Sequence, residues 1–359
     1  MSQPQQNRPA SLWKKFLQRR SSVVILLVLG LLYFAALFAP FLAPYSASSQ
    51  QLQHAYHPPT PPVVRGGKIG IRKYELADPA SRKFSPVPGS FVEVKFFAAG
   101  ESYRLFGVIP MRVRLFSAAE GERIYVLGAD HFGRDVFSRL LYGAQVSLSV
   151  GLIGIAITTV IGLLLGSLAG YLGGVADQFL MRLTEVLMSI PGLYLILALR
   201  AAFGEGLSSA QTYLMIVIIL SFIGWCGMSR VIRGMTLSLR ERDYVTAARA
   251  TGVPMWRILV RHIIPNTFSY VVVAATLSVP GYILGEAALS FLGLGIAEPD
   301  SSWGLMLSQA QSIRVLTSFW WMLTPGALII ITVMTFNFLG DALRDAVDPR
   351  FQPLSLQKK

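Results

Sequence analysis

Four charged residues of alternating sign lie close together: Asp130, Arg134, Asp135 and Arg139. Carboxylates and guanidinium groups at this spacing can form strong, charge-assisted hydrogen bonds. An uncharged stretch, 140–176, follows at once and is long enough to cross a membrane. We therefore predict that the cluster pairs internally and holds the start of a helix at the membrane interface, in preference to contacting a solute.

Patterns typical of catalysis or metal binding are absent from the sequence. The histidines, His54, His57, His131 and His262, are scattered, and none has the spacing of a metal-binding pair. No glycine loop ends in Gly-Lys-Ser or Gly-Lys-Thr, so the chain does not bind ATP by that route. A single cysteine, Cys226, excludes a disulfide within the chain. We expect this chain to bind no metal or cofactor and to hold no catalytic residue.

A second segment combines good helix formers over 241–251 with Gly252, which ends a helix, and Pro254, which begins another. Ala247 and Ala248 give the first helix a small, flat face. This face suits insertion into a groove on a partner protein. A basic loop held near anionic lipid headgroups is the alternative, and the residues alone leave both open.

Membrane helices must position these segments, because the composition is that of a membrane protein. Of 359 residues, 53% are hydrophobic and only 14% are charged, and the mean hydropathy is +0.52. Soluble domains have about 25% charged residues. The first long apolar stretch exceeds the core of a cleaved signal peptide. We predict membrane spans at 23–43, 146–171, 183–203, 211–228, 262–283 and 319–340.

Small and aromatic residues add detail to these spans. Gly162, Gly166 and Gly170 repeat at every fourth position. Because this spacing lets helix backbones approach closely, we expect the glycine face to pack against another helix. Three tryptophans are assigned to an aromatic belt at the outer membrane surface: Trp303, Trp320 and Trp321.

Basic residues indicate the orientation. The tails, 1–22 and 341–359, together with the connections 171–182 and 230–261, carry 17 basic and 6 acidic residues. Short connections on the opposite side are nearly bare of basic residues. We therefore place both termini and the 230–261 loop in the cytoplasm. The net charge of +13 is then mostly an orientation signal and does not indicate a nucleic-acid partner.

The segment 44–138 is the one region that resembles a soluble domain. Polar and apolar residues alternate over 91–97 and 111–116, a pattern typical of β-strands, and we assign turns to 86–89 and Gly100. Long loops translocate largely regardless of charge. We predict a small β-rich extracytoplasmic insertion, which is either an adaptor for a soluble partner or an elaboration without a function of its own.

The segment around Ala247, Ala248 and Gly252 also resembles the EAA loop of ABC importer permeases. The pattern of that loop is Glu-Ala-Ala, three residues, Gly, nine residues and Ile-x-Leu-Pro. Ala247, Ala248, Gly252 and Pro265 stand at the required spacing. Three residues depart from the pattern, in place of Glu, Ile and Leu respectively: Thr246, His262 and Ile264.

Three further segments narrow this resemblance. The segment 127–143 resembles the Gly-x-Asp-x-x-Gly-Arg-Asp-x-x-Ser-Arg signature that precedes the second span in the C-type inner-membrane permease subunits of dipeptide and oligopeptide ABC importers, the nickel-peptide class. The segment 286–307 is similar to the stretch after the fifth span of that family, and 336–350 to its C-terminal ending. The region 58–126 does not match the usual short connection of the family.

The resemblance implies an all-α polytopic membrane protein whose six transmembrane helices have the ABC importer permease fold, with a core at 139–340 and the β-rich insertion added. It implies peptide import across the bacterial inner membrane. The implied partners are a second homologous permease, two cytoplasmic ATPase subunits that bind the ATP, and an extracytoplasmic solute-binding protein. Import of nickel or another small solute, a membrane channel, and an enzyme or receptor centred on 44–138 are the alternatives.

The resemblance also assigns residues. Those of the ATPase-coupling loop are Asp243, Tyr244, Thr246, Ala247, Ala248, Arg249, Gly252 and Pro265. Those of the family signature are Asp130, Gly133, Arg134, Asp135, Ser138 and Arg139. Glu286 lies near the outer end of the fifth span, where it either pairs with a polar neighbour or contacts the amino terminus of a peptide on the translocation path.

Overall fold

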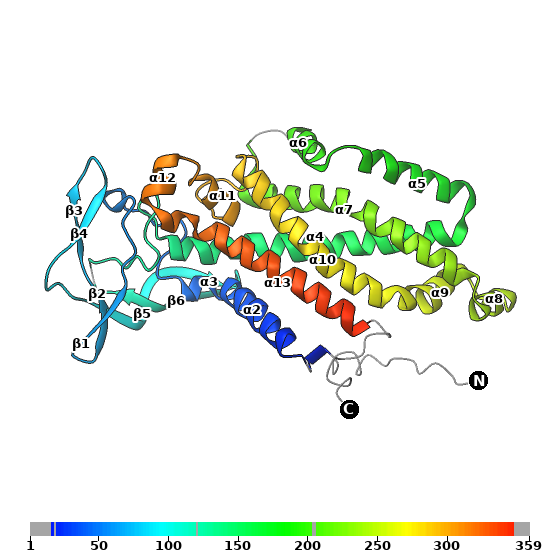
Figure 1. Ribbon diagram of the computed structural model, residues 1–359, viewed down its shortest axis with the longest axis horizontal. Coiled ribbons are helices and arrows are strands. Elements are labelled where there is room, and N and C mark those ends of the chain that lie inside the picture. Colours follow the sequence, from blue (N-terminus) through cyan, green and yellow to red (C-terminus); the bar gives the residue numbers. More distant parts are fainter. Residues whose placement is uncertain (1–15, 18, 120, 203–205, 348–359) are drawn as a thin grey trace, which may run out of the picture.

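The computed structural model describes residues 16–17, 19–119, 121–202 and 206–347. Within them, five helices are long and apolar enough to cross a membrane, and a bent pair adds a sixth candidate. The long helices are α2 (Arg20–Leu37), α4 (Val136–Leu172), α7 (Ser209–Arg240), α10 (Ile264–Phe291) and α13 (Thr324–Val347). Figure 1 shows them side by side along the long axis, with the strands at one end. The predicted tails 1–22 and 341–359 lie largely outside the described residues.

Helices α4 and α7 extend ten or more residues beyond the spans predicted from hydropathy. Helix α4 begins ten residues before 146, because the Asp135 side chain caps it. Helix α7 continues twelve residues past 228 to Arg240, and this extension carries Arg230, Arg233 and Arg240. The predicted loop 230–261 is therefore helical over its first third. Hydropathy identifies only the part of a helix that lies in lipid, whereas the hydrogen-bonded helical backbone can continue beyond it.

The third predicted span, 183–203, is not one straight helix. Helices α5 (Gly174–Ser189) and α6 (Gly192–Ala202) meet at a 95° bend. Pro191 lies at the break, and the residue before a proline is disfavoured in helical geometry. Residue 203 lies outside the described residues.

The glycine face of α4 packs against α7, as predicted. A Cβ on Gly166 would lie 2.5 Å from the backbone oxygen of Ser229, and one on Gly170 would lie 2.7 Å from that of Arg233. Only glycine allows the two backbones to come this close. These two helices form the central packed pair of the membrane region.

The remaining helices are short. They are α3 (Ala39–Leu42), η1 (Leu52–His54), α8 (Asp243–Ala250), α9 (Met255–Ile258), the π-helical turn η2 (Leu259–Ile263), α11 (Trp303–Ser308), α12 (Ile313–Ser318) and η3 (Trp320–Leu323). In Figure 1, α8 and α9 lie at one end of the bundle, and α11 and α12 lie at the other, near the strands.

The segment after α2 is β-rich, as predicted. A four-stranded antiparallel sheet has the order β1-β2-β5-β6, and β3 pairs with β4. The strands are β1 (Pro62–Arg65), β2 (Lys68–Ile71), β3 (Tyr74–Asp78), β4 (Lys83–Pro86), β5 (Val92–Leu105) and β6 (Ile109–Ala118). The turn predicted at Gly100 is wrong. Gly100 lies inside β5, where a Cβ would come within 2.8 Å of the Arg114 side chain.

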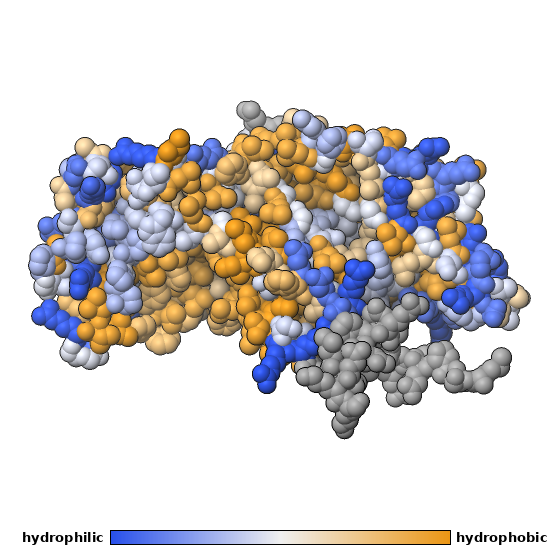
Figure 2. Space-filling model, viewed as in Figure 1, coloured by the Kyte–Doolittle hydropathy of each residue, from blue (hydrophilic) through white to orange (hydrophobic). Residues whose placement is uncertain are grey.

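The surface follows this division. In Figure 2 hydrophobic residues dominate the middle of the molecule, and hydrophilic residues gather at the end that holds α8 and over parts of the strand end. The start of α2 and the end of α13 are joined by an ion pair of 2.6 Å between Arg19 and Asp345. The described ends of the chain therefore lie together, away from the sheet.

Candidate coupling surface and outer charge network

The loop before α4 folds around Asp130. Its Oδ1 accepts hydrogen bonds from the backbone N–H groups of Phe132, at 2.9 Å, and Arg134, at 3.0 Å. Gly133 has a φ of +70°, and a Cβ there would lie 1.9 Å from the backbone oxygen of Gln51. Glycine is therefore required at this turn. The turn directs the Arg134 side chain toward Glu298, in the loop between α10 and α11.

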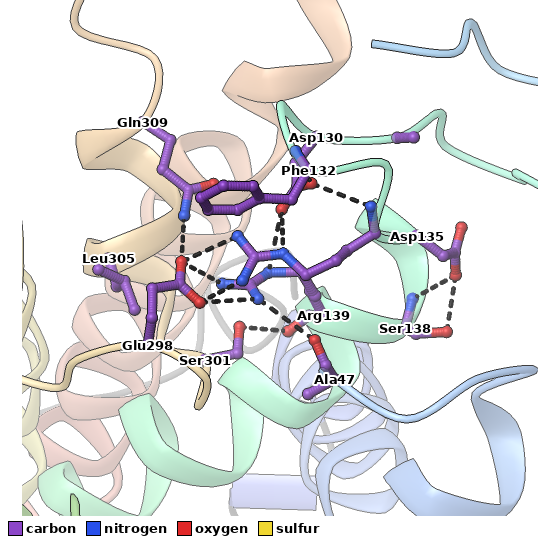
Figure 3. Close-up of polar contacts among 12 residues, drawn as sticks. Ala47, Asp130, Phe132, Asp135, Ser138, Arg139, Glu298, Ser301, Leu305 and Gln309 are labelled. Atoms are coloured by element: carbon purple, nitrogen blue, oxygen red, sulfur yellow. Dashed lines mark hydrogen bonds and ion pairs between the residues drawn. The ribbon is translucent and has the colours of Figure 1, made fainter. Parts of the chain in front are cut away.

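Arg134 and Arg139 converge on one carboxylate, that of Glu298 in the loop between α10 and α11 (Figure 3). Arg134 Nη2 donates to Glu298 Oε1 at 2.9 Å, and its Nη1 pairs with Oε2. Arg139 donates to the two carboxylate oxygens at 3.3 Å each. Arg134 Nε also donates to Asp130 Oδ2 at 2.7 Å. We call these four residues the outer charge network.

The network is nearly closed to solvent. The Arg134 and Arg139 side chains are 4% and 0% exposed, whereas that of Glu298 is 35% exposed. Hydrogen bonds and charge from Arg134 and Arg139 outweigh the desolvation of Glu298 and lower the pKa of its carboxyl. Gln309 donates a further hydrogen bond to Glu298 at 2.6 Å. With two cations and two anions, the network is neutral, and of its buried side-chain donors only Arg139 Nε has no hydrogen-bond partner among the described residues, lying 3.7 Å from Asp130 Oδ2.

The remaining signature residues begin α4. Asp135 Oδ2 accepts from both the backbone N–H and the hydroxyl of Ser138, each at 2.7 Å, which makes Asp135 the N-cap. Burial raises the pKa of the Asp135 carboxyl to about 7. The Ser138 hydroxyl oxygen also accepts from the backbone N–H of Tyr45, at 3.3 Å. These contacts tie α4 to the chain that leaves α2 and α3.

Glu286 is fully buried between α10 and α4. Its Oε2 accepts from the Ser147 hydroxyl at 2.8 Å, and its Oε1 accepts from the Ser290 hydroxyl at 2.7 Å. This is the first of the two predicted alternatives, a pairing with polar neighbours. The described chain leaves none of its side chain on a surface that a solute could reach.

Two of the three tryptophans assigned to the aromatic belt are instead internal anchors. Trp303 is fully buried, and its indole N–H donates to the backbone oxygen of Leu140 at 3.0 Å. The Trp321 indole N–H donates to the backbone oxygen of Ala129, also at 3.0 Å. An indole can serve either role, because it combines a large apolar area with one donor. Trp320 is exposed.

At the opposite end, α8 rests on a small apolar cluster. Val245, Ile258 and Ile263 are each 0% exposed and pack together. Tyr171, at the end of α4, packs against them, and the Arg249 guanidinium lies 5.3 Å from its ring centroid. The coupling segment is therefore held against α9, η2 and the end of α4.

The other face of α8 is open. Asp243, Tyr244, Thr246, Ala247 and Arg249 are exposed. The structure gives the Asp243 carboxylate no hydrogen-bond or ion-pair partner among the described residues. Ala248 is half-buried against the apolar cluster. The prediction of one flat face formed by both alanines is thus wrong, because a step of 100° per residue places neighbouring side chains on different faces.

The ends of this segment match their predicted roles. Gly252 follows α8 with a φ of +77°, and Pro254 is the N-cap of α9. Pro265 lies in the first turn of α10, directly after the π-helical turn η2. Proline has no N–H to donate to the preceding turn, and a π-turn is one way for a helix to accommodate this. The run from Met255 to Phe291 therefore stays helical.

Glu298 is the network residue that motif reasoning missed. The loop 292–318 holds only two acidic residues, Glu298 and Asp300. Two buried arginines on a neighbouring segment require carboxylates nearby. A search for counter-charges in the loop 292–318 would therefore have given two candidates, of which Glu298 is the one that pairs.

A family model described as the binding-protein-dependent transport system inner membrane component matches residues 162–353. The chain belongs to this family. It comprises the membrane permease subunits of ABC transporters, in which the ATPase is a separate subunit. A second model, the N-terminal TM domain of oligopeptide transport permease C, matches residues 10–59. Family and helices together make this permease a multi-pass membrane protein.

Relatives of this permease include the oligopeptide transport system permease protein OppC of Haemophilus influenzae, 42% identical over 64% of this chain and 71% of that protein. The dipeptide transport system permease protein DppC of Bacillus subtilis is 41% identical over 63% and 68%, respectively. Among solved structures, the MetNI methionine ABC transporter in inward-facing conformations matches 58% of this chain and 96% of that chain, with 20% identity and a TM-score of 0.45.

Proposed function

We propose that this permease is one of the two membrane subunits of an ATP-driven importer for peptides. The observation that carries the proposal is the open face of α8, presented on a helix whose other face is fixed to the ends of the spans. A docking site for a motor needs both properties, because contact must be possible and displacement must be transmitted. The peptide substrate rests on the relatives, which are named as oligopeptide and dipeptide permeases.

In this proposal α8 and both termini face the cytoplasm. The excess of basic residues supports this orientation. The ion pair between Arg19 and Asp345 supports the placement of both ends on one side. The sheet β1–β6 and the outer charge network then lie outside, where a solute-binding protein delivers the peptide.

Coupling follows from how α8 is held. When two cytoplasmic ATPase subunits bind ATP and close, they push on α8. The cluster of Val245, Ile258 and Ile263 cannot be compressed, because protein interiors are close-packed. Arg240, at the end of α7, donates to the backbone oxygen of Gly170 at 3.0 Å and links α7 to α4. The push therefore moves the ends of α4, α7 and α10 together, as rigid bodies.

The proposal assigns ATP to the partner ATPases and gives this chain no chemical step. A second homologous permease completes the path through the bilayer. Glu286 supports the packing of α10 on α4 in this scheme, and selection of the peptide falls to the solute-binding protein. A nickel importer of the same architecture is the second candidate, and the peptide names of the relatives favour the first.

The test is Ala247→Asp in an importer assembled from this chain, its partner permease, the ATPases and the binding protein. Ala247 is exposed on the open face of α8, so the new carboxylate leaves the fold intact and obstructs docking. We expect loss of peptide uptake, together with loss of its coupling to ATP hydrolysis. Uptake of a labelled peptide and phosphate release in proteoliposomes are the measurements.

Ala176→Asp is the matched control. Ala176 is exposed in the first turn of α5, so the same substitution is made at the same end of the bundle but off the α8 face. This variant should transport at the wild-type rate. Normal uptake by Ala247→Asp would contradict the docking assignment, and purification of an active chain without ATPase subunits would favour a channel.

A further inference from the structure

The long hairpin of β5 and β6 has an apolar tip that nothing in the described chain covers. Exposed fractions are 50% for Phe106, 78% for Val108 and 50% for Ile109. Along β5, Phe96 and Phe97 are also more than half exposed. An exposed apolar group of this size is unusual on a surface that faces water, and it marks an interaction site.

The hairpin is fixed beside the membrane helix α2. The Phe106 ring lies 5.5 Å from that of Phe38, which in turn lies 4.6 Å from that of Phe34 on α2. The Phe97 ring lies 6.3 Å from that of Phe41 on α3. Figure 1 shows β5 and β6 directed toward α3 and the end of α2. The tip is therefore level with the last turn of a membrane span.

A buried arginine sets this position. Arg114 of β6 is 0% exposed and donates to the backbone oxygens of Ala43, at 2.7 Å, and Pro40, at 3.3 Å. It thereby satisfies free carbonyl groups at the end of α3. Gly100 on β5 leaves the space for its side chain. These hydrogen bonds hold the hairpin in a fixed position beside the end of α2.

The exposed surface of the tip continues the exposed surface of α2. On α2, Leu31 is 68% exposed, Phe34 51% and Leu37 53%. In a membrane-spanning helix such side chains face lipid. Figure 2 shows the hydrophobic surface continuing from the helices onto the part of the strand region beside them. Through Phe34, Phe38 and Phe106, the lipid-facing surface of the helix extends onto the hairpin.

The charges around the tip also suit lipid. Residues 102–119 include Arg104, Arg112 and Arg114 and no acidic residue. Arg104 and Arg112 are exposed on either side of the apolar tip. Long basic side chains can extend from an inserted apolar surface to phosphate headgroups. This combination of aromatic residues and arginine is typical of elements that lie in the membrane interface.

The turn itself is built at a conformational cost. Phe106 has a φ of +53°, a region that bulky residues rarely adopt. Glycine or asparagine is the usual choice at such a position. A phenylalanine there packs its ring on Phe38, between α2 and α3, while Val108 at the tip stays 78% exposed, so the turn holds the exposed apolar tip beside the end of α2.

We propose that the β5–β6 hairpin is a second membrane anchor, whose tip inserts into the leaflet at the sheet end of α2. Phe106, Val108 and Ile109 lie among the acyl chains near the headgroups, and Arg104 and Arg112 contact the phosphates. The sheet is thereby fixed against the bilayer. This inference rests on the spanning of the membrane by α2 and not on the identity of the solute.

Spin-label accessibility in the full chain tests the proposal. Cys226 is the only cysteine, so Cys226→Ser gives a clean background for Val108→Cys or, as a second site, Ile109→Cys. The labelled protein is reconstituted in vesicles of phosphatidylcholine and phosphatidylglycerol. We expect collisions with oxygen, which concentrates in lipid, to exceed those with a water-soluble nickel chelate by several-fold.

Two reference sites fix the scale. Leu31→Cys reports the lipid-facing side of α2, and Ala77→Cys reports an exposed position on β3. Labels at Val108 and Ile109 should resemble that at Leu31. Accessibility resembling that at Ala77 would overturn the proposal, because the tip would then face water. Shielding from both reagents would also overturn it, because a protein partner would then cover the tip.

Discussion

The outer charge network and the α8 surface both hold charged residues, but they treat them in opposite ways. In the network, Arg134 and Arg139 are enclosed and share Glu298 and Asp130. On α8, Asp243 has no charge partner among the described residues. Charges that are satisfied within the chain indicate a structural clasp. Charges and small side chains left open indicate a surface that a partner completes.

The two regions also differ in how they join distant segments. The network ties the start of α4 to the loop between α10 and α11, so it fixes the ends of two spans on the strand side relative to each other. The α8 cluster ties the opposite ends of the spans to one short helix. The strand end of the bundle is thus held by a buried charge network, whereas α8 at the other end is held mainly by apolar packing.

The largest expected effect is that of Arg134→Ala. This change leaves the buried Asp130 and the partly exposed Glu298 with only Arg139 between them. Loss of one partner from a buried ion pair costs about 3–5 kcal/mol. We expect a marked fall in the thermal unfolding temperature of the detergent-solubilised protein and in the yield of folded protein.

Arg182→Ala is the control for this prediction. Arg182 donates to Glu185 at 3.0 Å, but its side chain is 83% exposed. Exposed pairs contribute about 0–1 kcal/mol, so the unfolding temperature should hardly change. Equal effects of the two substitutions would show that the outer network is not the clasp inferred from its burial.

Much of this architecture was predictable because membrane spans obey simple rules. Apolar length located the five long helices, and the glycine spacing identified the face of α4 that packs on α7. The strands at 91–97 and 111–116 followed from alternation. The ends of α8 and α9 followed from Gly252 and Pro254, whose backbone preferences are local.

What sequence reasoning missed depends on contacts between distant segments. Glu298 lies 164 positions after Arg134, and no local pattern links the two residues. The bend near Pro191 could not be predicted with certainty from the sequence, since a proline in a membrane span does not always break the helix. Val245 is the buried residue of α8, and this sets Ala247 on the exposed face and Ala248 against the apolar cluster. The sequence alone does not show which residue of α8 is buried.

Val245→Ala tests the apolar cluster beneath α8. It removes two methyl groups from the cluster under α8, and we expect a loss of about 2 kcal/mol, by analogy with other cavity-forming substitutions. Ala247→Asp, on the open face, should stay within about 0.5 kcal/mol of the wild type. Chemical unfolding in detergent measures both. A larger loss for Ala247→Asp than for Val245→Ala would reverse the two faces of α8.

The smallest effect concerns Asp135, which caps α4 beside the outer network. Asp135→Ala removes the acceptor for the Ser138 N–H and should cost about 1 kcal/mol. Asp135→Asn keeps a capping oxygen and should cost less. Comparison of the two variants separates the contribution of the capping hydrogen bond to stability from that of the carboxylate charge.

The charge of Asp135 has a pH dependence of its own. Its folded pKa of about 7 lies above the ordinary value of 3.8, so the folded state binds the proton more tightly than the unfolded state does. The stability that this proton provides is present at low pH and is lost as the pH rises through that range to about 7. Wild-type stability should therefore fall between about pH 5 and about pH 8 relative to that of Asp135→Asn, which has no proton to lose. Parallel unfolding curves for the two proteins at both pH values would mean that Asp135 is already ionised in the folded state, and the cap would then be a charged one like the carboxylates of the network beside it.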